Sequence, residues 1–288
     1  MKPRYSFSSH RTRRTENIKK QRPKYPELAK AVIEDSDIVL EILDARFLEE
    51  TRNKELEEEI LKKGKKVIFI LNKADLVDPK KIPKEQLKEL LPYVFISCKE
   101  REGVRELRKK LQIESKRIVR KPLTAEQIKQ GFDNRIKVGI IGYPNTGKSS
   151  LINVLVGKNA AGVGSDAGFT RGMQKVKLTS DIVLIDSPGV IPKDQYSQIK
   201  TDKITKNTKV GGRSYSQVRN PEDVVHLIMT DHPGILEEHY KLDTKGDVDE
   251  LLDRLGRKKG ILKRGGEPNT DLVARNVLKE WQTGKIRK

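Results

Sequence analysis

Cysteine, tryptophan and histidine are scarce in this sequence of 288 residues, which holds one cysteine, one tryptophan and four histidines. The single thiol, Cys98, has no partner for a disulfide within the chain, and no set of cysteines and histidines has the spacing of a zinc site. The sequence therefore predicts neither a disulfide framework nor a structural zinc. A reducing cytoplasm is the expected location.

Long hydrophobic segments are also lacking. The longest apolar run, within 66–71, is far shorter than the roughly 20 residues that cross a bilayer. Hydrophobic residues make up 35% of the chain, and its mean hydropathy is −0.67. Basic residues at the N-terminus lead into no apolar core, so this end does not have the form of a secretory signal. We expect no membrane association.

Acidic residues are outnumbered by basic ones. The chain has 60 Lys+Arg against 41 Asp+Glu, which gives a formal net charge of +19. Such a field attracts polyanions, and RNA is the commonest large polyanion of the cytoplasm. A charged fraction of 35% is also typical of heat-adapted proteins, but that alternative explains the total charge and not the imbalance. We therefore predict a nucleic-acid or nucleoprotein partner.

The first 24 residues are basic and poor in apolar side chains. Too little surface can be buried there to offset the entropy of ordering, so a flexible arm is predicted over 1–24. A solvated tail without a function is the alternative.

After the arm, short apolar runs alternate with amphipathic segments. Strands are predicted at 37–43, 67–71, 93–97 and 136–141, near 176, and at 182–185. One predicted helix has Leu56, Ile60 and Leu61 on one face and ends at Gly64. A polar stretch at 115–133 predicts a connector. This alternation indicates an α/β domain over 25–195, with a mainly parallel sheet covered by helices on both faces.

The character of the chain changes beyond Ile191. Residues 193–221 are polar and basic, and RNA contacts are expected there from Lys200, Lys203, Lys206, Lys209, Arg213 and Arg219. Helices alone are predicted afterwards, at 221–229, 248–255 and 272–281. The sequence therefore predicts a small all-α C-terminal domain within 196–288. We expect Trp281 to anchor its core, because a large aromatic in an amphipathic helix is usually buried.

A phosphate-binding motif lies between a predicted strand and a predicted helix. Residues 142–149 read G-Y-P-N-T-G-K-S and match the pattern G-x-x-x-x-G-K-[ST]. The glycines let successive N–H groups point inward, and a lysine adds positive charge at the start of a helix. The residues expected to contact phosphates are Asn145, Thr146, Gly147, Lys148, Ser149 and Ser150.

Residues for a magnesium ion follow. Asp186-Ser187-Pro188-Gly189 comes directly after an apolar strand, where the aspartate can hold the Mg²⁺ shell and the Gly189 N–H can meet a γ-phosphate. Thr170 lies in a glycine-rich segment between the two motifs and supplies a second hydroxyl. We predict Ser149, Thr170 and Asp186 as the magnesium ligands.

Base selection is predicted from two further strand ends. Asn72-Lys73-Ala74-Asp75 has the N-K-x-D form. The Asp75 carboxylate can accept hydrogen bonds from N1–H and the 2-amino group of guanine, whereas adenine would leave it unpaired. The stem of Lys73 can cover the purine face. Ser97-Cys98-Lys99 would place the Cys98 N–H against guanine O6, with the thiol chemically idle.

The order of these motifs is unusual, since the guanine motifs precede the phosphate loop. All lie at strand ends, so the site can form unchanged if the original termini were close together. The sequence therefore predicts a circularly permuted P-loop GTPase domain.

With these motifs the chain resembles the circularly permuted GTPases of the YlqF/YawG (RbgA-like) family. The resemblance extends over about 25–288 and includes Asp44-Ala45-Arg46, the stretch 264–268, Trp281 and Gly284-Lys285. It implies a role in ribosome assembly, most often of the large subunit. Two related permuted groups fit less well, because one has an N-terminal OB-fold with a zinc-binding tail and the other an N-terminal zinc finger.

The sequence as a whole predicts a monomeric switch that hydrolyses GTP on a ribosomal particle. The predicted catalytic residues are Asn145, Lys148, Thr170 and Gly189. Val190 stands where many GTPases carry a water-orienting glutamine, so slow intrinsic turnover is expected. In related GTPases the asparagine equivalent to Asn145 binds potassium, which the resemblance extends to this chain. The alternatives are an RNA-binding scaffold with GTP as a structural ligand and a regulatory GTPase with non-ribosomal partners.

Overall fold

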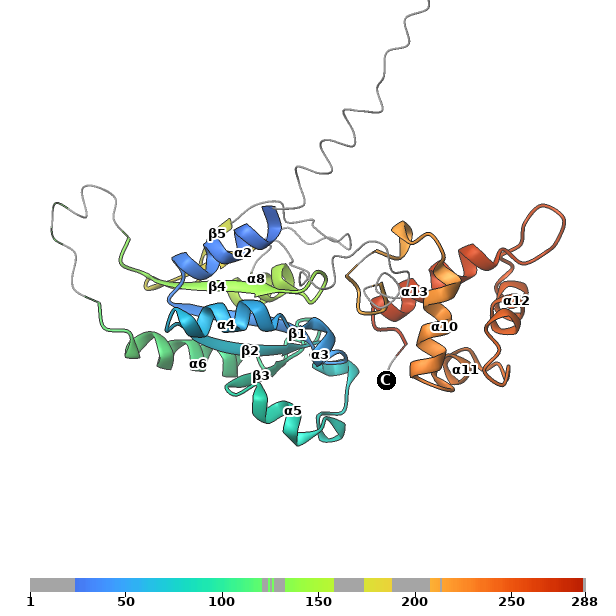
Figure 1. The fold of residues 1–288 in the computed structure, drawn as a ribbon, viewed down its shortest axis with the longest axis horizontal. Coiled ribbons are helices and arrows are strands. Elements are labelled where there is room, and N and C mark those ends of the chain that lie inside the picture. The colour runs from blue at the N-terminus through green and yellow to red at the C-terminus, as the bar shows by residue number, and fades with distance from the viewer. Residues whose placement is uncertain are drawn as a thin grey trace, which may run out of the picture.

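The computed structural model describes residues 24–120, 124, 126, 133–157, 174–187, 208–212 and 214–286. Within them, six strands form one sheet in the order β3-β2-β1-β4-β6-β5 (Figure 1). The strands are β1 (Ile38–Asp44), β2 (Lys66–Asn72), β3 (Tyr93–Ile96), β4 (Ile136–Gly142), β5 (Gln174–Lys177) and β6 (Ile182–Asp186). All neighbouring pairs are parallel except β5 and β6, so the predicted mainly parallel α/β sheet is confirmed.

Helices cover both faces of the sheet because the strand side chains alternate between two apolar surfaces. On one face, Val39 packs with residues of α2 (Lys24–Asp35) and α4 (Lys54–Lys62). On the other face, Ile38 and Leu40 pack with α6 (Val104–Arg117) and α8 (Lys148–Val156). Shorter elements lie in the connections: α3 (Leu48–Thr51), η1 (Ala74–Leu76), η2 (Pro79–Lys81) and α5 (Lys84–Glu89).

Three local predictions need correction. Leu61 is 66% exposed, because Leu56 and Ile60, four residues apart, face the sheet while Leu61 is turned about 100° away from Ile60. The predicted connector at 115–133 begins too early, since α6 continues to Arg117. The helix α2 was not predicted and forms the start of the described chain.

A helical body follows the sheet domain, as predicted. It contains η4 (Tyr215–Gln217), α10 (Pro221–Asp231), α11 (Ile235–Tyr240), α12 (Val248–Lys259) and α13 (Thr270–Gln282). The sequence did not indicate α11, which buries only Leu236 and Tyr240 and is too short to show a period. The predicted boundary between 195 and 196 lies outside the described residues. Among the helices described, none is long and apolar enough to cross a membrane.

The helical body lies beside the end of the sheet that carries α3 (Figure 1). Its apolar core includes Trp281, which is 1% exposed, so the predicted core anchor is confirmed. Phe47, just after β1, and Tyr143, just after β4, belong to the same buried cluster. The two bodies therefore share a continuous hydrophobic contact at the carboxyl ends of the strands.

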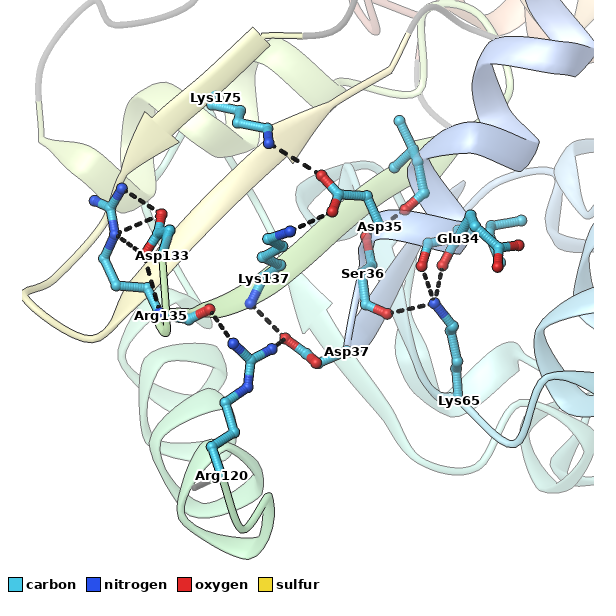
Figure 2. Close-up of polar contacts among 12 residues, drawn as sticks. Glu34, Asp35, Ser36, Asp37, Lys65, Arg120, Asp133, Arg135, Lys137 and Lys175 are labelled. Carbon is cyan, nitrogen blue, oxygen red and sulfur yellow. Dashed lines mark hydrogen bonds and ion pairs between the residues drawn. The ribbon is translucent and has the colours of Figure 1, made fainter. Parts of the chain in front are cut away.

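A polar network joins the opposite ends of these strands (Figure 2). Arg120, three residues after α6, donates to Arg135 O at 2.9 Å and pairs with the Asp37 carboxylate. The same carboxylate accepts the Lys137 N–H at 2.7 Å. Lys65 donates to Ser36 O at 2.7 Å and so satisfies backbone beyond the end of α2. The network ties both ends of the segment between α6 and β4 to the start of β1.

We expect Arg120→Ala to reduce the free energy of unfolding by about 1–2 kcal/mol, because it removes a partly buried ion pair and a backbone contact together. Arg117→Ala is the matched control, because the mostly exposed Arg117 side chain pairs with Glu114, which keeps a second partner in Lys66, and the change should cost less than about 0.5 kcal/mol. Urea unfolding measures both values. Equal losses would show that Arg120 has no special part in closing this segment.

Candidate functional site

The loop between β4 and α8 has the geometry of an anion cradle. Gly147 has a φ of 101°, and a Cβ there would lie 2.2 Å from Asn72 Nδ2, so only glycine fits. The Lys148 ammonium lies under the loop and donates to Tyr143 O at 2.8 Å and to Gly142 O at 3.2 Å. Burial lowers the pKa of Lys148 to about 8. A phosphate anion beside this ammonium would offset that desolvation.

Asn72 joins the phosphate loop to both predicted base loops. It is the last residue of β2, and its Nδ2 donates to Thr146 O at 2.7 Å. Its Oδ1 accepts the Cys98 N–H at 3.3 Å. One buried side chain therefore fixes the spacing between three loops that come from three different strands.

The Asp75 carboxylate is held by the buried Ser97, whose Oγ donates to Asp75 Oδ1 at 2.7 Å. The Ser97 Oγ in turn accepts the Glu100 N–H at 3.1 Å. Burial, aided by the Asp75 charge, raises the pKa of Cys98 to about 12. The Cys98 thiol is therefore protonated at neutral pH, in agreement with the idle role predicted for it.

Two of the three predicted magnesium ligands, Ser149 and Asp186, meet at the start of α8. Ser149 Oγ donates to Asp186 Oδ2 at 3.3 Å. Among the described residues, Asp186 Oδ1 is a buried oxygen without a hydrogen-bond partner, and burial raises the Asp186 pKa to about 6 although Lys148 lowers it. The Ser149 hydroxyl and the Asp186 carboxylate, whose Oδ1 has no hydrogen-bond partner among the described residues, are hard oxygen donors of the kind that Mg²⁺ prefers, so the site fits this ion. Three predicted residues lie outside the described ones: Thr170, Gly189 and Val190.

A cavity of about 420 Å³ is lined by the residues predicted to select the base. Its sheet-domain lining consists of Asn72, Lys73, Asp75, Leu76, Cys98, Lys99, Asn145, Gly147 and Ser150. The helical body adds Tyr215, Gln282 and Thr283, which the motifs did not indicate. The only sequence signal near them is the run from Trp281 to Lys285, which carries part of the family resemblance.

The Asp44-Ala45-Arg46 segment connects this cavity to the helical body. The buried Asp44 carboxylate accepts Lys73 Nζ at 2.7 Å, and Arg46 Nε and Nη2 at 2.9 and 2.7 Å. Arg46 Nη1 donates to Trp281 O at 2.9 Å. Burial by itself raises the Asp44 pKa, but Lys73 and Arg46 outweigh it and hold that pKa far below its usual range. The marker of the family is thus a buried ion cluster.

The chain just before α10 is docked onto the phosphate loop. Asn145 Nδ2 donates to Gly211 O at 2.7 Å. Lys209, which the sequence suggested as an RNA contact, is buried and pairs with Asp231 at 2.6 Å, so that prediction is wrong. Its carbonyl accepts the Trp281 Nε1–H at 3.0 Å. The charge of Lys209 is therefore neutralised within the helical body, because Asp231, the last residue of α10, lies within reach.

Comparisons with known proteins agree with this geometry. The GNP-bound crystal structure of YlqF from T. maritima superposes with a TM-score of 0.62 at 24% identity, covering 92% of this chain and 95% of that one, which shows the fold. Residues 137–247 match the family described as "50S ribosome-binding GTPase". An uncharacterized GTP-binding protein of Methanocaldococcus jannaschii is 38% identical over 88% of this chain.

Ribosome biogenesis GTPase A of Bacillus pumilus is 31% identical, and the match covers 87% of this chain and 88% of that protein. The chain belongs to the YlqF/RbgA-like family of circularly permuted GTPases. The order of motifs expected of the YlqF/RbgA-like family explains why the match to 137–247 includes the phosphate loop but not 72–75. Other relatives are longer: the chain spans 64% of the M. jannaschii protein and 49% of the Caenorhabditis elegans guanine nucleotide-binding protein-like 3 homolog.

Proposed function

We propose that this chain binds GTP and hydrolyses it to GDP and phosphate, as a timed switch on a ribosomal particle. The contact of Asn72 with Thr146 and Cys98 carries the proposal, because it sets a phosphate cradle and a base pocket at a fixed spacing. A ligand that spans both must have a base at one end and phosphates at the other. The match to the family described as "50S ribosome-binding GTPase" and the similarity to ribosome biogenesis GTPase A support guanine as the base and the ribosome as the partner.

In this proposal each residue of the site contacts one part of the ligand. Asp75, oriented by Ser97, accepts the two donors of guanine, and the Lys73 stem covers the ring. Lys148 and the loop N–H groups bind the β- and γ-phosphates. Ser149 and Asp186, with Thr170, would hold Mg²⁺, and the ion supplies positive charge to those phosphates. Gly189 meets the γ-phosphate in this proposal.

The ribosomal partner, and within it the large subunit, is supported by charge and by the family description. The net charge is +19, and a group of exposed basic side chains lies at the end of α12 and in the connection to α13: Arg257, Lys258, Lys259, Lys263 and Arg264. Cations on an exposed turn suit contacts with RNA phosphates. A cytoplasmic location and a monomeric state stay predictions of the sequence.

A steady-state phosphate-release assay tests the proposal. We expect slow release by the protein alone and an acceleration of at least about tenfold with purified large ribosomal subunits, because a partner can complete a site that lacks a glutamine after Gly189. Lys148→Ala should abolish the release in both conditions. Equal slow release with either subunit or none would instead favour the scaffold that keeps GTP as a structural ligand.

Base choice is tested by Asp75→Asn. An amide cannot accept both guanine donors, so the affinity for GDP should fall about 100-fold. The affinity for xanthosine diphosphate should rise relative to that for GDP. Asp78→Asn is the matched control, since Asp78 is an exposed acid that caps η2. Calorimetry with both nucleotides gives the affinities. Unchanged GDP binding by the Asp75 variant would remove Asp75 from the base site.

Potassium dependence tests the role proposed for Asn145. The amide nitrogen of Asn145 is engaged by Gly211 O, so a cation would use Oδ1. We expect several-fold faster phosphate release in KCl than in NaCl at equal ionic strength, and loss of the difference in Asn145→Ala, because the cation neutralises developing charge on the phosphates. The same rate in both salts would exclude the ion.

A further inference from the structure

The base cavity is incomplete without the helical body. One part of its wall is formed by Gln282 and Thr283, the last residue of α13 and the residue after it, together with Tyr215 of η4. Thr283 caps α13, and its N–H donates to Lys279 O at 3.0 Å. The cavity wall is therefore the ordered carboxyl end of a helix.

A close backbone contact holds this helix end against the base loop. Gly284 follows Thr283 with a φ of 75°, and a Cβ there would lie 2.4 Å from Leu76 Cδ1. Leu76 is the residue after Asp75 and is buried. A side chain at 284 would be strained by its backbone angle and would push α13 away from the loop that carries Asp75.

The buried ion cluster fixes the same helix end from a second direction. Trp281 O accepts Arg46 Nη1 at 2.9 Å and also the Gly284 N–H at 3.1 Å. Arg46 pairs with Asp44, and Asp44 pairs with Lys73, which lines the cavity. A cation at a helix carboxyl end is favourable, because it faces the negative end of the helix dipole. Three short contacts therefore connect α13 to Lys73.

We propose that the end of α13, through Gln282 and Thr283, forms a wall of the guanine-base site, so that binding of the base and docking of the helical body strengthen each other. This inference rests on the proposed guanine-nucleotide function and adds a specificity element from outside the G domain. By linkage, a ligand with the base favours the docked helix, and the docked helix favours that ligand by the same factor.

The test compares Thr283→Phe with Leu272→Phe in the full chain. Both positions are exposed residues of α13 or its cap, but only Thr283 lines the cavity. We expect Thr283→Phe to weaken GDP binding at least about tenfold while leaving the affinity for pyrophosphate within about twofold. The reason is that the added ring fills only the part of the cavity where the base would bind, away from the phosphate loop. Leu272→Phe should change neither. Thr283→Gln repeats the test with an uncharged polar side chain.

The outcomes separate this inference from the proposed function. If the parent protein binds GDP and both Thr283 variants bind it equally well, the end of α13 does not form a wall of the base site, and the proposed GTPase function stands. If GDP and pyrophosphate affinities fall together, α13 acts on the whole site and the base wall is again wrong. A parent protein that does not bind GDP overturns the proposed function itself.

Hydrogen exchange measures the reciprocal effect without a variant. Saturating GDP should slow exchange of the Gly284 amide, which donates to Trp281 O, more than saturating pyrophosphate does. Equal slowing by the two ligands would contradict a contact between the base and α13.

Discussion

The Asp44 carboxylate is the group on which the arrangement of the two bodies depends. It is completely buried, and an isolated charge at such a position would be very costly. Lys73 and Arg46 neutralise it from two sides, and Arg46 is itself satisfied by Trp281 O. Removing one member of a buried ion cluster costs about 3–5 kcal/mol, because the remaining charge is left without a partner. The base loop, the end of β1 and α13 are thereby kept in one geometry.

The permuted order of the chain is compatible with this site because the site depends on strand ends and not on chain order. Parallel strands bring their carboxyl ends to one edge of the sheet, where Asn72 reaches Thr146 from a strand two positions away. At the opposite edge, Arg120 contacts both Asp37 and Arg135. It thereby holds together the two ends of the connection between α6 and β4. A permutation therefore changes which elements a connecting loop must join at this opposite edge. The edge with the carboxyl ends of the strands, where the nucleotide is proposed to bind, stays unchanged.

The sequence predicted what is governed by local patterns. Apolar runs and the fixed spacing around Lys148 identified the strands and the loops at their ends. It failed where tertiary contacts decide: Lys209 was expected to face RNA but is buried against Asp231, since charge in sequence carries no information on a partner 22 residues away. Thr283 was missed for the same reason. No motif marks a helix end that becomes part of a site only after two bodies dock.

The helix α13 connects the two surfaces on which the proposed function depends. It begins next to the turn at 262–268, where the Asn269 N–H donates to Ile261 O, and this turn lies at the end of the helical body away from the sheet (Figure 1). It ends 13 residues later at the cavity, about 20 Å along its axis. A helix whose buried face is packed into the body's core moves as a rigid element. In the proposed function, a displacement of α13 at the cavity would therefore also move the exposed basic turn.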